Sequence, residues 1–149
     1  MSRVLIRETG EYIHPEYRII YFDGYLPYPP SINHYWKLGK NGKRFICPAG
    51  KTYLSMISVL MHREYDGFYL HQFDIIPDNA ELSVFMTFYL PDNRGRDLDN
   101  VPKCIFDCFQ KCEIWKNDKQ VCELFSRKRR PDPRFPAGAV FIECAELDD

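Results

Sequence analysis

The junction between an apolar run at residues 81–90 and a helical pattern at residues 100–111 constrains the fold of this chain most strongly. The run alternates in part between apolar and polar residues and stops at a proline, which predicts a strand. Asp99 or Asn100 is a suitable N-cap for the helix, and Pro102 is tolerated in its first turn. A strand, a short polar loop and a helix in this order favour a helix layered on a sheet.

The rest of the chain adds strands, a second helix and a basic loop. Apolar runs rich in β-forming residues predict strands at 18–26, 121–127 and 139–145. Apolar residues spaced by three and four predict a helix at 50–65, and glycines within a basic stretch predict a hairpin or mobile loop at 37–44. We therefore expect an α+β two-layer sandwich, in which a mixed β-sheet carries two main helices on one face.

A chain of 149 residues fits one domain, and 45% apolar residues are enough for one core. We expect a single domain over residues 1–149, with residues 1–20 as an N-terminal extension that adds a strand or an arm. No apolar run approaches the ~18 residues that a membrane helix needs, and Arg7 and Glu8 interrupt any signal-peptide core. These features predict a cytoplasmic protein.

Six cysteines without a secretory signal predict reduced thiols rather than disulfides. Cys104, Cys108 and Cys112 are spaced by four residues and lie along one stripe of the expected helix. Zinc binding would need ligands elsewhere, so burial in the core is the favoured interpretation. The core is also the default for Phe109 and Phe125, whose alternative place is a dimer interface.

Basic residues concentrate in two segments, although the net charge of the chain is only −1. Segments 37–51 and 127–134 together hold ten of the twenty lysines and arginines, and one of the twenty-one acidic residues. Such polarisation suits a protein with one phosphate-facing surface. Two solvated charged loops explain it equally well, so charge alone leaves both interpretations open.

Asp97 and Asp99 are the first candidates for chemistry, because only Leu98 separates them. Residues i and i+2 of an extended chain project to the same side, so both carboxylates would point one way while Leu98 turns back to the core. Two close carboxylates repel each other unless a cation lies between them, and oxygen ligands suit Mg²⁺ or Mn²⁺. The alternative is a helix N-cap at Asp99 and a surface acid at Asp97.

The surroundings of this pair favour phosphate chemistry. The N-terminus of a helix attracts anions, and two arginines stand directly before the pair. Lys103 lies one helical turn after Asp99 on the same face. Asp107, four residues further on, would hold Lys103 through an ion pair, although an ordinary exposed ladder of charges explains the same spacing.

Asp118 lies in a short polar turn between the expected helix and the strand at 121–127. If that strand pairs near the strand that ends at Leu90, Asp118 comes close to Asp97. An Asn-Asp sequence in such a position is ordinarily just a turn. The residues alone therefore leave the role of Asp118 open.

Four ordered motif blocks resemble the RusA family of Holliday-junction resolvases. The resemblance spans residues 24–145, and its most specific part is 96–120. Two departures are Gly95, which interrupts a basic run that is denser in the family, and Pro102 within the helix. The blocks are Pro29-Pro30-Ser31-x-Asn33-x-Tyr35-Trp36, Arg96-Asp97-Leu98-Asp99-Asn100-x-x-Lys103, Phe106-Asp107 and Ile114-Trp115-x-x-Asp118-x-Gln120.

The resemblance implies a homodimer that binds four-way DNA junctions and nicks two strands symmetrically with Mg²⁺. Three carboxylates would hold the metal ion, and a lysine would be required for catalysis. The residues that match these roles are Asp97, Asp99 and Asp118 for the metal and Lys103 for catalysis, with Asn100 and Asp107 in support.

Candidate DNA contacts follow from charge and aromatic character. Tyr35 and Trp36 would stack on bases or wedge at a branch point, unless they pack beneath their own loop. Rival functions are a nuclease on other branched DNA, such as forks or flaps, and a non-catalytic junction-binding protein. The basic residues expected to contact phosphates are Lys37, Lys40, Lys43, Arg44, Lys51, Arg94 and Arg96.

Overall fold

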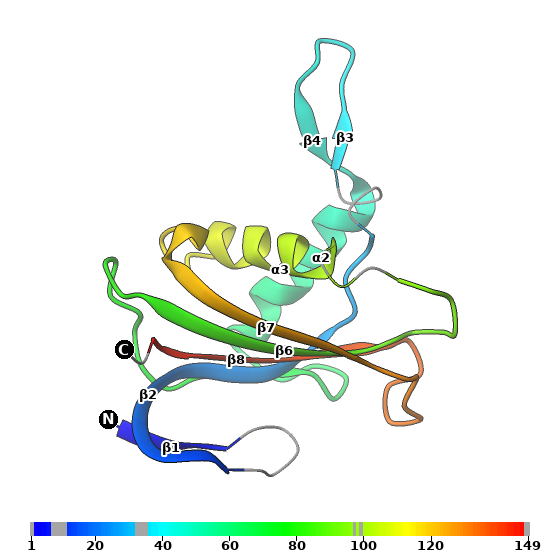
Figure 1. Cartoon of the computed structure of the whole chain (residues 1–149). Helices are drawn as coiled ribbons and strands as arrows, with labels where there is room; N and C mark the ends of the chain where they lie inside the picture. The colour runs from blue at the N-terminus through cyan, green and yellow to red at the C-terminus, as the bar shows by residue number, and fades with distance from the viewer. Residues whose placement is uncertain (1, 7–11, 32–35, 97, 99, 148–149) are drawn as a thin grey trace.

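A mixed β-sheet with two helices against one face forms the body of the protein (Figure 1). The computed structural model describes residues 2–6, 12–31, 36–96, 98 and 100–147. This arrangement confirms the expected α+β two-layer sandwich. The described strands of the sheet are β1 (Ser2–Ile6), β2 (Tyr12–Pro27), β5 (Tyr69–Gln72), β6 (Leu82–Tyr89), β7 (Val121–Arg129) and β8 (Ala139–Glu146), and the helices are α2 (Pro48–Leu60) and α3 (Asn100–Lys111).

The strands follow the order β1–β2–β8–β6–β7, and β5 pairs with β2. Neighbouring strands are antiparallel except for β6 and β7, which run parallel with Leu82 opposite Val121 and Tyr89 opposite Arg129. A parallel pair needs a crossover connection, and the segment that contains α3 supplies it over one face of the sheet. The starts of β6 and β7 therefore lie at one edge of the sheet, and their ends lie together at the opposite edge.

The buried stripe of α3 joins the helical layer to the sheet. Cys104, Cys108 and Phe109 have no exposed surface, and their spacing puts them on one face of the helix. Trp115, just after the helix, is 1% exposed and meets the ring of Phe109 edge-on at 5.3 Å between centroids. The favoured interpretation of Cys104, Cys108 and Phe109 as core is confirmed, and Cys112 is half-buried.

Phe125 does not take the core position that was its default. Its side chain is 49% exposed on β7, and the neighbouring Leu124 is 41% exposed. β7 stands at the end of the strand order and therefore has one neighbour rather than two. Side chains on such an outer strand stay near solvent even when they are apolar, so the default interpretation was wrong for this residue.

The boundaries of most elements agree with the sequence, and α3 covers the predicted residues 100–111. β2 begins at Tyr12 and pairs its first half with β1, so the described N-terminal residues supply strands. α2 ends at Leu60 rather than at residue 65. β5 was not predicted, because its four residues carry no clear alternation and only pairing with β2 reveals it. In the described part of the chain, no helix is long and apolar enough to cross a membrane.

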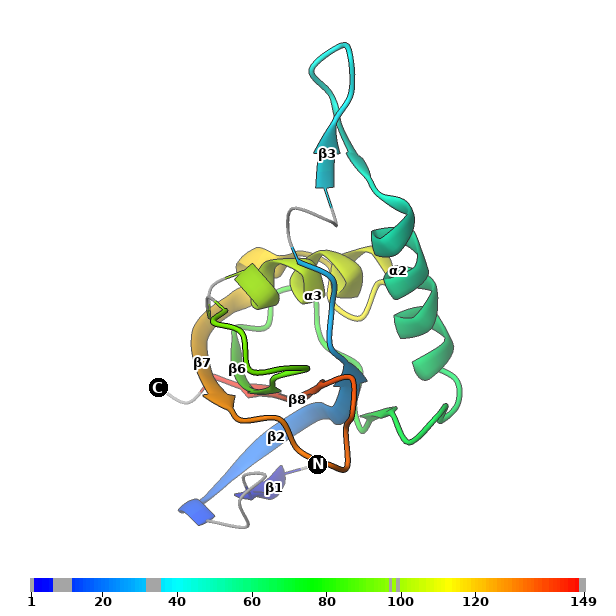
Figure 2. The ribbon, with the colours of Figure 1, turned by 90° about the vertical axis from the view of Figure 1, so that its right-hand side faces the viewer.

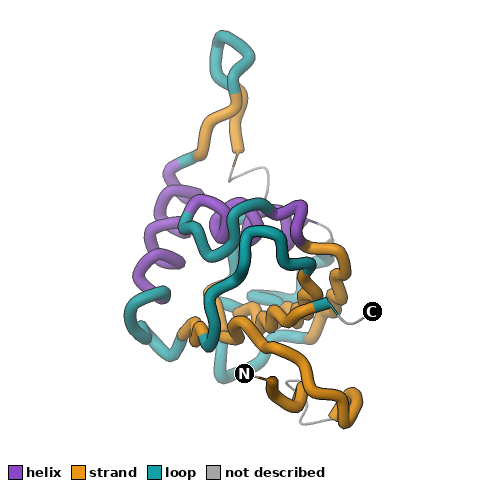
Figure 3. The backbone as a smooth tube through the Cα atoms, turned by 90° about the vertical axis from the view of Figure 1, so that its left-hand side faces the viewer, coloured by secondary structure: helices purple, strands orange, loops and turns teal. Residues whose placement is uncertain are grey.

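Strands β3 (Trp36–Leu38) and β4 (Arg44–Ile46) form a hairpin, one of the two structures expected for the basic stretch. Figures 1 and 3 show this hairpin projecting beyond α2, away from the sheet. Gly42 at its tip has a φ of 75°, a conformation that glycine adopts without strain. Leu38 is 73% exposed. The hairpin therefore extends into solvent on the helical side of the molecule.

Candidate active site

The loop between β6 and α3 leads into the second motif block. The Leu90 N–H donates a hydrogen bond to the Arg129 carbonyl at 3.1 Å, which ties the start of this loop to the end of β7. Asp97 and Asp99 lie outside the described residues. Leu98 is 36% exposed, so the expectation that it turns back into the core is wrong. The reason is that Leu98 belongs to the turn that enters α3 and not to an extended strand.

Asp92 binds two arginines of this loop. Its Oδ1 accepts a hydrogen bond from the backbone N–H of Arg94 at 3.0 Å. Its Oδ2 accepts bonds from Nε and Nη2 of Arg94 at 3.2 and 3.0 Å, and from Nη2 of Arg96 at 2.8 Å. These bonds, those of Arg94 first, lower the pKa of the Asp92 carboxyl from its ordinary 3.8 to about 2. Asp92 thus orients both arginines that precede Asp97.

Arg96 has further contacts beyond Asp92. Its guanidinium lies over the ring of Tyr28, 5.6 Å from the centroid, and its carbonyl accepts a hydrogen bond from Lys128 Nζ at 2.9 Å. Burial raises the pKa of the Tyr28 hydroxyl, and the charge of Arg96 opposes part of that rise. The buried Nε of Arg96 has no hydrogen-bond partner among the described residues.

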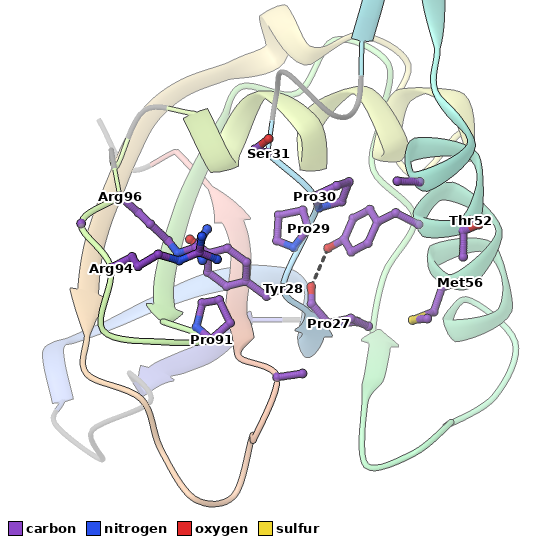
Figure 4. A pocket seen from close by; sticks show the side chains of 14 residues that line it. Pro27, Tyr28, Pro29, Pro30, Ser31, Thr52, Met56, Pro91, Arg94 and Arg96 are labelled. Atoms are coloured by element: carbon purple, nitrogen blue, oxygen red, sulfur yellow. Dashed lines mark hydrogen bonds between the residues drawn. The ribbon is translucent and has the colours of Figure 1, made fainter.

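A cavity of about 600 Å³ lies beside Arg96, between the end of β2, α2 and the loop after β6 (Figure 4). The hydroxyl of Tyr53 on α2 donates a hydrogen bond to the carbonyl of Pro27 at 2.8 Å and braces one wall. The fold therefore brings the first two motif blocks to one cavity. The lining residues that these blocks contribute are Pro29, Pro30, Ser31 and Arg96.

Lys103 lies in the first part of α3, and its side chain is exposed. The sequence suggested that Asp107 holds this lysine. In the structure Asp107 pairs with Lys111, with 3.0 Å between Oδ2 and Nζ. In a helix, an acid four residues before a base forms a more stabilising pair than an acid four residues after a base. Asp107 stands before Lys111 and after Lys103, so the pair with Lys111 is the favoured one. The role of Lys103 in catalysis stays a prediction.

Asp118 begins a short 3-10 helix, η1 (Asp118–Gln120), directly before β7. Asn117 and Gln120 form a capping box around it, and the amide of Gln120 also donates to the carbonyls of Pro77 and Ala80 at 3.0 Å. The backbone N–H of Asp118 donates to Gln110 Oε1 at 3.1 Å. This network holds the turn in place, and the Asp118 side chain remains exposed.

Asp118 and the start of α3 lie far apart within one copy of the chain. The strand after Asp118 does pair with the strand that ends near Leu90, but the pair is parallel, so Asp118 lies beside the start of β6. The 12 residues of α3 span ~17 Å and lie between Asp118 and the turn at Leu98. Among the described residues, no three His, Cys, Asp or Glu side chains gather closely enough to hold a metal ion.

The described DNA-contact candidates other than Arg96 are exposed, whereas Arg96 is half-buried. Lys40, Lys43 and Arg44 lie on the hairpin, Lys51 on α2 and Arg94 beside the cavity. Asn33 and Tyr35 lie outside the described residues, as do the side chains of Trp36, Lys37 and Asn100. Their proposed roles stay predictions.

The sequence analysis assigned no role beside the cavity to Tyr28, Asp92 or Lys128, although Lys128 belongs to the basic segment 127–134. Asp92 had a local signal, because an aspartate readily binds the backbone N–H two residues later. No local pattern placed Tyr28 or Lys128 beside Arg96. Their contacts with Arg96 depend on where β2 and β7 end in space, which local sequence does not show.

The comparison with known families decides where this chain belongs. The sequence model of the family described as endodeoxyribonuclease RusA matches residues 27–136. The chain belongs to the RusA family. The expected resemblance is thereby confirmed, and the protein is an enzyme of the endodeoxyribonuclease class. β1 and most of β2 lie before the matched segment of this RusA-family chain.

Curated relatives carry the name crossover junction endodeoxyribonuclease RusA. The protein of Enterobacteria phage 82 is 32% identical over 98 residues, which are 66% of this chain and 74% of that protein. The protein of Enterobacteria phage HK97 is 28% identical over 123 residues, 83% of this chain and 92% of its own length. The protein of Escherichia coli strain K12 is 28% identical over 98 residues, with shares of 66% and 74%.

Proposed function

We propose that this protein is a Mg²⁺-dependent endonuclease that resolves four-way DNA junctions by symmetric nicking as a homodimer. The observation that carries the proposal is the meeting of two motif blocks at one cavity. There the family's proline-rich segment lies against Arg96, the residue directly before Asp97. The names of the relatives, which specify a crossover junction as the substrate, support the same conclusion.

The proposed metal ligands are Asp97, Asp99 and Asp118. This donor set fits Mg²⁺, with Mn²⁺ as a substitute, because it consists of carboxylates alone. The exposed side chain of Asp118 stands on a turn that a capping box holds in place, so it can act as a ligand without further ordering. When bound, the metal ion would neutralise charge on the phosphate and lower the pKa of an attacking water.

The separation of Asp118 from the start of α3 supports a dimer. A single copy does not bring Asp118 near Leu98, so a site with three aspartates would need one of them from a second copy. A two-fold axis would then create two equivalent sites, which suits paired nicks in a junction of roughly two-fold symmetry. Leu124 and Phe125 leave apolar side chains exposed on β7, and such a second copy would cover them.

The basic residues would act on the phosphate itself. Arg96 is held by Asp92 and Tyr28, and its guanidinium would bind the scissile phosphate. Lys103, exposed in the first part of α3, would stabilise the charge that develops on the phosphate or on the leaving oxygen. Both groups would bind the transition state more strongly than the ground state.

The test uses labelled four-way junction, fork, flap and linear duplex DNA, with Mg²⁺ or with EDTA. Wild-type protein should place paired symmetric nicks in the junction, and EDTA or the Asp97→Asn substitution should abolish them. Asp66→Asn is a suitable control, because Asp66 is exposed and its φ of 53° is one that asparagine also adopts.

Two results would contradict the proposal. Tight junction binding without cleavage in Mg²⁺ or Mn²⁺ would indicate a non-catalytic junction-binding protein. Faster cleavage of forks or flaps than of four-way junctions would indicate a nuclease on other branched DNA.

A further inference from the structure

The basic residues of the β3–β4 hairpin are not the only ones that gather on the described surface. A second basic surface lies at the end of β7, separate from the cavity beside Tyr28. We call it the strand-end surface, and its cationic residues are Lys128, Arg129 and Arg130, all of them exposed. Together with Tyr89 and the segment 131–133 they line a shallow groove of about 610 Å³. The family match implied no role for these residues, and charge alone left their function open.

Two hydrogen bonds connect the strand-end surface to the candidate active site. Lys128 Nζ donates a hydrogen bond to the carbonyl of Arg96 at 2.9 Å. The carbonyl of Arg129 accepts the N–H of Leu90 at 3.1 Å, where the loop to α3 begins. The basic residues are therefore held beside Arg96 and the start of the loop to α3.

The nearby acid does not cancel the charge of this surface. Asp132 is bound by Arg134 through the backbone N–H at 2.8 Å and through Nη2 at 2.9 Å. The hydrogen bonds from Arg134 lower the pKa of Asp132, so this carboxylate stays ionised and paired. The guanidinium of Arg134 in turn lies over Phe135, 5.2 Å from the ring centroid. Lys128, Arg129 and Arg130 thus keep their net positive charge.

The hairpin and the strand-end surface flank the start of α3 on opposite sides. Figures 1 and 2 agree that the β3–β4 hairpin projects from the helical side, whereas β7 ends at the level of the sheet. The loop after β6 and the first turn of α3 lie between them in both views. A DNA strand cut near Asp97 would therefore meet positive charge on both sides of the scissile phosphate.

We propose that the strand-end surface binds the sugar–phosphate backbone of a DNA arm, on the side of the scissile phosphate opposite the hairpin. This inference rests on the proposed function. Arginine and lysine contacts to phosphate carry no base specificity, so this surface would set affinity and register rather than sequence preference. Its exposed arginines match the geometry of phosphate oxygens.

The experiment compares the double variants Arg129→Ala/Arg130→Ala and Lys40→Ala/Lys43→Ala, with Arg63→Ala in the turn after α2 as the control. Each binds a four-way junction in Ca²⁺ across a salt series, and hydroxyl-radical footprints map the protected nucleotides. Each double variant should lose about tenfold or more in affinity, and the slope of log K against log salt should fall by about two. The two variants should lose protection on opposite sides of the cleavage site.

Several results would overturn the inference. They are an unchanged salt slope for Arg129→Ala/Arg130→Ala, loss of protection at the same nucleotides in both variants, and a change in oligomeric state with unchanged DNA binding. A changed oligomeric state with unchanged DNA binding would show that the surface is a contact between protein copies.

The experiment also separates this inference from the proposed function. If the wild-type protein cuts junctions and Arg129→Ala/Arg130→Ala binds them with wild-type affinity and salt slope, this inference fails and the proposed function stands. If wild type neither binds nor cuts junctions, both fail. Thermal unfolding verifies that each variant is folded.

Discussion

At the scale of single residues, Asp92 shows how one carboxylate arranges two cations. Asp92 and Arg94 form the same fork as Asp132 and Arg134: in each, the aspartate accepts the backbone N–H and the guanidinium of the arginine two residues later. Only the first fork also holds a third residue, Arg96. The fork at Asp132 is therefore a local turn, whereas the fork at Asp92 also orients a residue of the candidate site.

We predict that Asp92→Asn slows junction cleavage by about tenfold to a hundredfold, because Arg96 loses the anion that directs its guanidinium. Binding should be unchanged or tighter, since the variant removes a negative charge beside the DNA. The control substitution Asp66→Asn should leave the cleavage rate within about twofold, because Asp66 is exposed and lies outside both the candidate site and the strand-end surface. Single-turnover cleavage rates and equilibrium binding measure the two effects separately. Equal losses of rate in both variants would argue against a positioning role for Asp92.

The low pKa of Asp92 predicts a pH dependence. Its pKa in the folded protein is about 2, and the ordinary value of 3.8 applies when the chain unfolds. The ionised carboxylate therefore contributes stability above pH ~4, and this contribution is lost as the pH falls towards 2. Carbon-13 NMR should show an Asp92 titration midpoint near 2, and the midpoint should rise towards 3.8 in Arg94→Ala. A wild-type midpoint near 3.8 would show that the fork does not persist in solution.

At the scale of secondary-structure elements, α3 buries its Phe109 side chain in the core, whereas β7 leaves its Phe125 side chain partly exposed. Phe109 on α3 has no exposed surface, whereas Phe125 on β7 is half-exposed. Phe109→Ala should lower the free energy of unfolding by ~3–5 kcal/mol, because it leaves a cavity under the helix. Phe125→Ala should change it by less than ~1 kcal/mol in the isolated protomer. Urea unfolding at low protein concentration measures both, and a large loss for Phe125→Ala would place this residue in the protomer core after all.

At the scale of the whole molecule, the central question is whether two copies build each site. We predict that Asp97→Asn and Asp118→Asn, each inactive alone, restore nicking when the two chains are refolded together. In a mixed dimer with shared sites, one site receives both native aspartates. Half of the dimers are mixed, so about a quarter of the wild-type sites are intact. The product should be junctions nicked in one strand.

The control for this mixing experiment pairs Asp97→Asn with Lys103→Ala. Asp97 and Lys103 are six residues apart in the chain and would serve the same site, so neither site of a mixed dimer would be complete and no activity should return. An inactive mixture of Asp97→Asn and Asp118→Asn, with mixed dimers demonstrated by mass spectrometry, would contradict a shared site.

The sequence by itself determined the features that depend on neighbouring residues. The limits of α3, its buried stripe of Cys104, Cys108 and Phe109, and the end of β2 at Pro27 all follow from capping, periodicity and proline geometry. The family also followed from sequence, because the motif residues keep their order and spacing. The identity of the motif residues predicts the kind of chemistry even when the distances between them are unknown.

Only the tertiary structure decided which of these residues meet. The parallel pairing of β6 and β7 places Asp118 at the far end of α3, and no local pattern distinguishes a parallel from an antiparallel neighbour. The contacts of Arg96 with Tyr28 and Lys128, and the exposure of Phe125, likewise depend on segments far apart in the chain. The physical reason is the same in each case. Strand direction and sheet order are set by the burial of the whole core, which no short stretch of sequence contains.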